Sequence, residues 1–188
     1  MASPSSSRPP GPDAFEQLGL PPRYDLDPAQ LERAFFERSK ELHPDRFAAA
    51  PAAERVAALS RARALNDAYA VLKRDASRAE YLLAREGVTI GDNERIDPEL
   101  VMALLEEREQ LAEARQRGEL REVERLAQAM RARRREALDR VAALFSAEAG
   151  AGPGAARADQ LAQIKRQLIL LRYIARYLEE CDHALDED

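Results

Sequence analysis

His43-Pro44-Asp45 is the part of the chain whose side chains offer the most chemistry. An imidazole close to a carboxylate can transfer a proton, bind a metal ion or form part of a docking surface. The chain has one cysteine and few hydroxyl side chains, which leaves His43 without an evident nucleophile to activate. Proline also ends a helix, so the three residues by themselves favour a helix-ending turn in which Asp45 caps.

The remaining reactive side chains do not form a site. Cys181 is the only cysteine, which excludes a disulfide framework and a cysteine metal cage. Cys181-Asp182-His183 offers too small a ligand set for a metal ion. The sequence has no phosphate-binding glycine loop and no nucleophile–base pair. We therefore expect no metal, no cofactor and no enzymatic activity of the chain's own.

Charge gives little sign of a nucleic-acid partner. The net charge is −5 at neutral pH, and six acids with no bases stand in the last ten residues. Arg133, Arg134 and Arg135 are the only dense basic run, and a solvated helix face accounts for it. We expect no nucleic-acid binding.

The composition predicts an all-α fold. Of 188 residues, 36 are alanine and 24 leucine, whereas valine, isoleucine and threonine together number 12 and tryptophan is absent. Helix formers therefore dominate, and the side chains that favour strands are scarce. No stretch of 18 apolar residues and no signal-peptide pattern occurs, so we expect no membrane span and a cytoplasmic location.

Glycine and proline divide the chain into segments. Residues 1–12, with four prolines and four serines, predict a disordered leader. We place a first domain at 13–86, a linker at 87–96, a second domain at 97–182 and a solvated, disordered acidic tail at 183–188.

The first domain is predicted to contain four helical segments. A short turn at 14–18 ends at Gly19, and Asp27-Pro28 begins a second helix that stops at Pro44. The run 52–86 is long enough to split near 73–76, where Asp75 or Ser77 can cap a new helix. Two sets of residues keep helical spacing, one on the second helix and one on the third: Leu31, Phe35, Leu42; Val56, Leu59, Arg63, Asn66, Ala70.

The second domain is predicted to be an antiparallel three-helix bundle. Asp97-Pro98 repeats the cap-plus-proline start, Gly118 ends the first helix, and residues 150–155 form a turn before the third. The first helix is predicted to have a broad apolar face, made by Leu100, Leu104, Leu111, Val101, Leu105 and Ala112. The expected core stripe of the third helix is Leu161, Ile164, Leu168, Leu171, Ala175 and Leu178.

Context gives the His-Pro-Asp triplet a second interpretation. Lying between two helices, it resembles the loop of the J-domain, the helical hairpin that activates ATP-driven chaperones of the HscA/DnaK class. The segments PPRYDLD at 21–27 and RAEYLL at 78–83 resemble one J-domain family in particular, the HscB co-chaperones of iron–sulfur cluster assembly. The predicted bundle also matches the HscB layout, so the resemblance spans about residues 13–182.

The resemblance implies which residues bind a chaperone. His43, Pro44 and Asp45 would dock onto the ATP-driven chaperone and promote its ATP hydrolysis. Three basic side chains of the preceding helix and one after the loop would support this contact: Arg33, Arg38, Lys40 and Arg46. Phe36 and Glu37 stand where many J-domains carry a basic pair, which predicts weak electrostatic steering.

The resemblance also implies a surface for an IscU-like scaffold protein on the first and last bundle helices. The matching positions are Val101, Met102, Leu105, Glu106, Glu109 and Tyr173. Tyr173 lies off the predicted core stripe, and an exposed apolar patch beside carboxylates is typical of a partner surface. Burial in a wide bundle core is the alternative, most of all for Val101 and Leu105.

Two other functions stay open at this point. The chain could be a J-domain co-chaperone whose bundle binds a different client. It could also be a helical adaptor in which the His-Pro-Asp triplet is a coincidence, although glycine and proline interrupt the heptads that a coiled coil needs.

Overall fold

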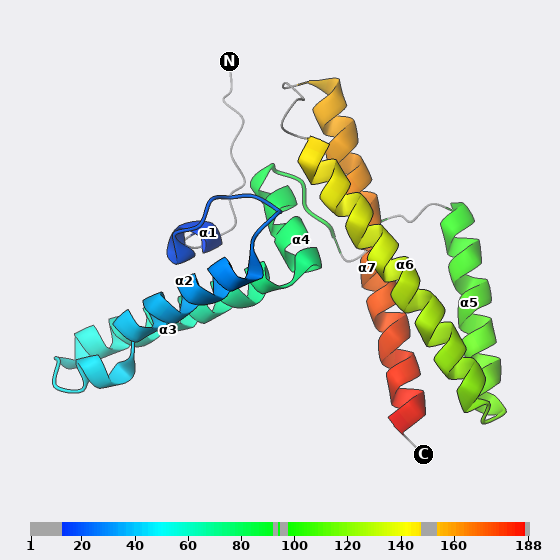
Figure 1. Cartoon of the computed structure of the whole chain (residues 1–188), viewed down its shortest axis with the longest axis horizontal. Coiled ribbons are helices and arrows are strands. Elements are labelled where there is room, and N and C mark those ends of the chain that lie inside the picture. Colours follow the sequence, from blue (N-terminus) through cyan, green and yellow to red (C-terminus); the bar gives the residue numbers. More distant parts are fainter. Residues whose placement is uncertain (1–12, 92–93, 95–97, 148–153, 187–188) are drawn as a thin grey trace. The chain divides into compact units, whose positions relative to one another are not determined.

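The computed structural model describes residues 13–91, 94, 98–147 and 154–186, and every regular element in these ranges is helical (Figure 1). The chain divides into two compact units, one up to Thr89 and one from Ile90. The predicted leader at 1–12, the cap at Asp97 and most of the turn at 150–155 lie outside the described residues. Within the described ranges, no helix is both long and apolar enough to cross a bilayer.

The first unit is a two-helix hairpin with a short helix at each end of the sequence. Its elements are α1 (Ala14–Leu18), α2 (Pro28–Glu41), the 3-10 turn η1 (Pro44–Phe47), α3 (Ala52–Lys73) and α4 (Asp75–Arg85). Figure 1 shows α2 and α3 running side by side, with η1 at the tip of the hairpin. Phe35 of α2 stacks on Tyr69 of α3 with ring centroids 4.2 Å apart.

The starts and ends of these helices follow the capping rules. The Asp27 carboxylate accepts a hydrogen bond from Ala29 N at 3.0 Å, and Pro28 occupies the first turn, as predicted. Gly19 ends α1 in the left-handed region at φ 65°, where glycine has no Cβ to clash. The predicted cap of α4 is wrong: Arg74 breaks the helix without a side-chain cap. Asp75 is instead an ion-pair partner of Arg78.

Buried Arg78 joins three elements of the unit. Its guanidinium donates to Tyr24 O at 2.7 Å, to Leu72 O at 2.6 Å and to the Asp75 carboxylate at 2.5 Å. It also lies over the Tyr24 ring, 5.1 Å from the centroid. The guanidinium fork thus fixes the segment before α2 against the junction of α3 and α4, which sets where the hairpin begins.

A second link fixes α1 to α4. Tyr81 Oη accepts a hydrogen bond from Ala14 N at 2.9 Å, and its ring packs against Phe15. The buried Asp13 carboxylate caps α1 and forms an ion pair with Arg85. Within the segment RAEYLL, Arg78 and Tyr81 thus form the polar contacts that join the helices, and Leu82 and Leu83 belong to the hydrophobic core.

The face that α3 buries is not the one that carries Val56 and Leu59. These two side chains are exposed, whereas Ala58, Leu65, Ala68 and Leu72 are buried. Two of the four buried residues are alanines, whose small side chains suit the close packing of a protein interior. Helical spacing of large apolar residues therefore does not by itself identify the buried face of α3.

The second unit contains three helices, α5 (Pro98–Gln116), α6 (Leu120–Ser146) and α7 (Ala155–Asp186). Gly118, at φ 65°, separates α5 from α6, as predicted. All three helices contribute buried side chains, among them Leu111, Val123, Ile174 and Tyr177. Two tyrosines of α7 attach α5: Tyr173 Oη donates to Leu104 O at 2.7 Å, and Tyr177 Oη donates to Glu107 O at 3.1 Å.

Three expectations for the bundle need correction. Ala175 is exposed, and Ile174 and Tyr177 are buried in its place, because α5 as well as α6 packs on α7 and shifts the buried stripe. The buried face of α5 is narrower than predicted, since Leu105 and Ala112 are exposed.

The third correction concerns the acidic tail. α7 continues through Asp186, four residues into the segment predicted to be disordered. Ala184 and Leu185 pack against the bundle core, and this apolar contact extends the helix. Residues 187–188 lie outside the described part of the tail.

The buried position of Arg78 gives a stability prediction. We expect Arg78→Lys to lower the free energy of unfolding of the first unit by about 2–4 kcal/mol, because a lysine cannot reach three acceptors in different directions. Arg63→Lys is the matched control, since Arg63 forms only an exposed pair with Asp67 at 4.0 Å, and its cost should stay below about 0.5 kcal/mol. Urea unfolding followed by circular dichroism measures both, and equal stability of the two variants would contradict the proposed clamp.

Candidate functional site

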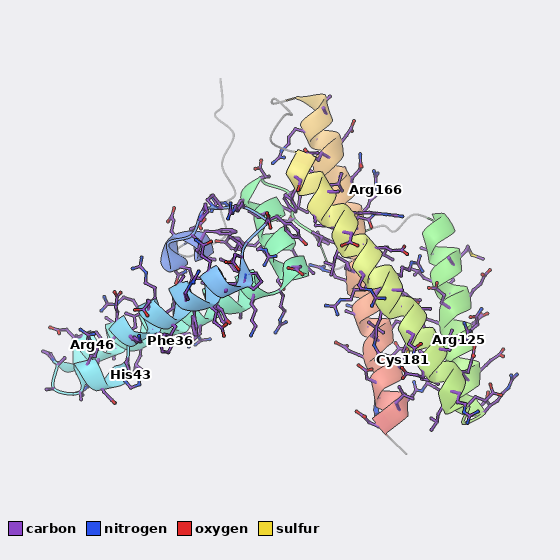
Figure 2. All side chains as sticks on the ribbon, in the orientation of Figure 1. Phe36, His43, Arg46, Arg125, Arg166 and Cys181 are labelled. Carbon is purple, nitrogen blue, oxygen red and sulfur yellow. The ribbon has the colours of Figure 1, made fainter. Side chains whose placement is uncertain are left out.

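The turn that contains His43 lies at the tip of the hairpin (Figure 2), where His43 and Asp45 are exposed. His43 caps η1 and Pro44 begins it, with Arg46 N donating to His43 O at 3.0 Å. The side chains of His43 and Asp45 are 59% and 91% exposed. A 3-10 turn with proline at its first position holds these two side chains outward at low conformational cost.

The His43 ring is oriented by its own turn. Nδ1 accepts a hydrogen bond from Asp45 N at 3.3 Å, so His43, rather than Asp45, is the capping residue. A neutral ring whose Nδ1 accepts carries its proton on Nε2, which is then a donor for a partner. The Asp45 carboxylate lies 3.5 Å from Nδ1 and keeps most of its surface for other contacts. The turn thus presents one oriented donor and one carboxylate.

Two of the basic side chains predicted to bind a chaperone lie close to acidic side chains of the same helix, α2. Lys40 pairs with Glu37 at 3.1 Å and lies 4.2 Å from the centroid of the exposed Phe36 ring, while Arg38 is 3.9 Å from Glu41. Arg33 and Arg46 are exposed and, among the described residues, form no ion pair. The surface of α2 therefore carries charges of both signs. Arg33, in the first half of α2, and Arg46, in η1, are the two basic side chains outside these pairs.

On the bundle, α5 presents the apolar surface predicted from sequence. Met102 is 61% exposed and Leu105 is 50% exposed, with Glu106 and Glu109 also exposed. Val101 is half-buried. Two large apolar side chains in solvent beside two carboxylates form a surface suited to a partner with apolar and basic groups. We call Met102, Leu105, Glu106 and Glu109 the α5 surface.

Tyr173 has a structural role that sequence alone did not reveal. Its ring is half-buried against the bundle core, 6.3 Å from the Tyr177 ring, and its hydroxyl donates to Leu104 O. Leu104 precedes Leu105 on α5, so Tyr173 holds the helix that carries the α5 surface. Burial raises the pKa of Tyr173 to about 12, so the hydroxyl stays a donor well above neutral pH.

Glu107 adds an ion pair to the same attachment. Its carboxylate lies 2.7 Å from the Arg133 guanidinium of α6, and both side chains are mostly buried. Burial raises the pKa of Glu107, and Arg133 opposes this shift. One Glu107 oxygen has no hydrogen-bond partner among the described residues. Of the three consecutive arginines, Arg133 thus helps to hold α5 against α6, whereas Arg134 and Arg135 are exposed.

Both units of the chain are similar to parts of known proteins. A family model described as the HSCB C-terminal oligomerisation domain matches residues 96–182. A co-chaperone protein HscB homolog of Azoarcus sp. (strain BH72) is 35% identical over 176 residues, which cover 93% of this chain and 94% of that protein. The chain belongs to the HscB co-chaperone family.

Other HscB proteins agree with this assignment over different lengths. The HscB homolog of Vibrio vulnificus (strain YJ016) is 46% identical over 101 residues, a match that spans 53% of this chain and only 59% of that relative. Chaperone HscB from Vibrio cholerae superimposes with a TM-score of 0.75 at 30% identity, covering 94% of this chain and 99% of its own. Human HscB, at 23% identity and a TM-score of 0.76 over 93% of this chain and 82% of its own, shares the fold.

The HscB fold consists of a J-domain followed by a helical bundle, so the expected fold class is confirmed. The two sequence segments that support the HscB resemblance lie away from the exposed turn. PPRYDLD and RAEYLL meet through Arg78 and Tyr24, and both serve to hold the J-domain together.

The raised pKa of Tyr173 predicts a pH dependence of stability. The unfolded chain loses this proton near pH 10, whereas the folded bundle keeps it to about pH 12. The resulting stability is complete below pH 10 and is lost as the pH rises toward 12. Burial acts in the same direction on Tyr177 and on Cys181, whose pKa is raised to about 11.

We expect urea unfolding between pH 9 and pH 11.5 to show falling stability, with a shallower fall in Tyr173→Phe than in the wild type. An identical slope in the two proteins would show that the Tyr173 hydroxyl is not protected by the fold.

Proposed function

We propose that this chain stimulates the ATPase of an HscA/DnaK-class chaperone and delivers to it an IscU-like scaffold protein of iron–sulfur cluster assembly. The observation that carries the proposal is the exposed His-Pro-Asp turn at the tip of the hairpin, in a chain of the HscB co-chaperone family. The lone cysteine, buried in the bundle core, suits a reducing cytoplasm.

The turn would act by binding, and the ATP chemistry would belong to the chaperone. Asp45 offers an exposed carboxylate for a charge-assisted hydrogen bond to a basic group, and His43 Nε2 offers a donor beside it. Because Pro44 and the Asp45 N–H hold the turn in place, little ordering is needed on binding. Tighter binding to the hydrolysis-competent state of the chaperone would raise the population of that state.

The basic residues would add modest steering. Arg33 and Arg46 are the side chains most able to reach an acidic partner, since Arg38 and Lys40 already have carboxylate neighbours. Long-range attraction should therefore be weaker than for a helix with a continuous basic stripe.

The scaffold protein would bind the α5 surface, with Val101 at its edge. Met102 and Leu105 supply apolar contact area, and Glu106 and Glu109 supply rim charges. Tyr173, which is half-buried, would contribute by holding α5 in position.

Chaperone activation is tested by substitution in the turn. We expect His43→Gln to reduce stimulation of the cognate chaperone's steady-state ATPase at least about tenfold, because the oriented imidazole donor is lost. Glu54→Gln, an exposed change at the start of α3, is the control and should stimulate as the wild type does. Full stimulation by His43→Gln would overturn the proposed role of the turn.

Scaffold binding is tested on the α5 surface. We expect Met102→Ala to weaken binding of an IscU-like scaffold about fivefold to tenfold in calorimetry, since an exposed apolar anchor is removed. Val56→Ala is a matched control, because Val56 is equally exposed, at 62%, but lies in the J-domain.

The outcome also separates the two possible clients. If the wild type stimulates the chaperone but does not bind the scaffold protein, the bundle serves another client. Unchanged scaffold affinity of Met102→Ala would place the binding surface elsewhere on the bundle.

A further inference from the structure

The groove between α6 and α7 extends beyond the start of α5. The bonds from Tyr173 to Leu104 and from Tyr177 to Glu107 show that α5 runs parallel to α7, each residue beside one 69 or 70 positions later. The first turn of α5, from Pro98, therefore lies level with residues 167–171 of α7. Since α7 begins at Ala155, about 18 Å of it precedes this level.

An open groove of about 470 Å3 lies in this region of the α6–α7 pair, and Figure 2 labels one of its residues, Arg166, on the amino-terminal half of α7. Its lining residues come from both helices: Arg140, Ala143, Leu144, Gln163, Arg166 and Gln167. Ala143 and Leu144 give it an apolar part, while two arginines and two glutamines give it polar groups. This combination suits a polypeptide segment better than a purely apolar ligand.

The two arginines of the groove are exposed and, within the described residues, form no ion pair. Other basic side chains of the bundle do: Arg131 pairs with Asp182, Arg133 with Glu107 and Lys165 with Glu94. Two unengaged guanidiniums on neighbouring helices form a site for carboxylates, because each offers a planar set of donors.

The exposed glutamine of the groove, Gln163, offers an amide that can donate to a carbonyl and accept from an N–H group. The Oε1 atom of Gln167 is buried and therefore does not face the groove. The nearby carbonyl of Leu144 already accepts from Gln160 Nε2. A segment of protein with acidic side chains would offer carboxylates to the two arginines and backbone groups to the Gln163 amide.

The groove and the α5 surface carry opposite charges. Glu106 and Glu109 make the α5 surface acidic, whereas Arg140 and Arg166 make the groove basic. Arg166 precedes Tyr173 by seven residues, which is roughly 10 Å along α7. A protein that contacts both surfaces would need basic groups facing the α5 surface and acidic groups facing the groove. This arrangement of charges would set the orientation in which it binds.

We propose that the groove at Arg140 and Arg166 binds an acidic segment of the same scaffold protein that contacts the α5 surface. This inference rests on the proposed function. Glu136 and Asp139 interrupt the basic residues of α6, so the groove lacks the continuous basic stripe that a nucleic-acid backbone requires. The arginines act on the encounter rate and orientation of the scaffold protein, and the apolar α5 surface holds it.

The test compares two double charge reversals in the full chain. Arg140→Glu with Arg166→Glu changes the groove, and Arg134→Glu with Arg135→Glu makes the same charge change at exposed α6 residues that do not line it. Binding kinetics of an IscU-like scaffold protein are measured at about 50 mM and 500 mM salt. We expect the groove variant to associate about tenfold more slowly at low salt and to approach the wild-type rate at high salt, while the control changes less than about twofold.

The outcomes separate this inference from the proposed function. Equal effects of the two double variants would overturn the groove as a site and leave only a general charge effect. If the wild type binds and Met102→Ala weakens binding, but the groove variant behaves as the wild type, the scaffold assignment stands and the groove assignment fails. If the wild type does not bind the scaffold protein at all, both fail. Circular dichroism melting confirms that each variant is folded, since all four arginines are exposed.

Discussion

The buried guanidinium of Arg78 is the interaction on which the J-domain depends. It joins Tyr24 before α2, Leu72 at the end of α3 and Asp75 at the start of α4. A charge in the interior is tolerable only when its donors are satisfied, and here three acceptors from different segments satisfy it. This junction fixes where α2 lies against α3. The position of the exposed turn at the far end of the hairpin depends in turn on how these two helices lie. The residues that distinguish the HscB J-domain thus act on the fold that presents His43 and Asp45.

The bundle depends on a different set of contacts, an aliphatic core supplemented by a few polar interactions. α6 and α7 bury leucine, isoleucine and valine against each other, while α5 contributes a narrower apolar face. Tyr173, Tyr177 and the Glu107–Arg133 pair add polar attachments that fix α5 along the axis of α7. Since α5 carries the exposed Met102 and Leu105, the same attachments fix the geometry of the α5 surface. The shorter α5 also leaves part of the α6–α7 groove to its two unengaged arginines.

Helical spacing predicted where helices lie better than which side of each helix is buried. The starts at Asp27-Pro28 and the ends at Gly19 and Gly118 were predictable, because capping and left-handed glycine are local effects. The buried side of α3 was not predictable, since Ala58 and Ala68 face close neighbours while the larger Val56 and Leu59 face solvent. The prediction that Ala175 belongs to the buried stripe was wrong for a related reason, since the residues that α7 buries depend on two partner helices.

The sequence by itself determined the helical class, the division into two modules and the exposed His-Pro-Asp turn, because composition, glycine, proline and a three-residue motif act within a few positions. It also indicated the apolar and acidic residues of α5. Tertiary structure alone decided that Tyr173 anchors α5 as well as lying at the surface, and that Arg140 and Arg166 line one groove. These are contacts between segments. They depend on how helices pack, and no local pattern of residues specifies them.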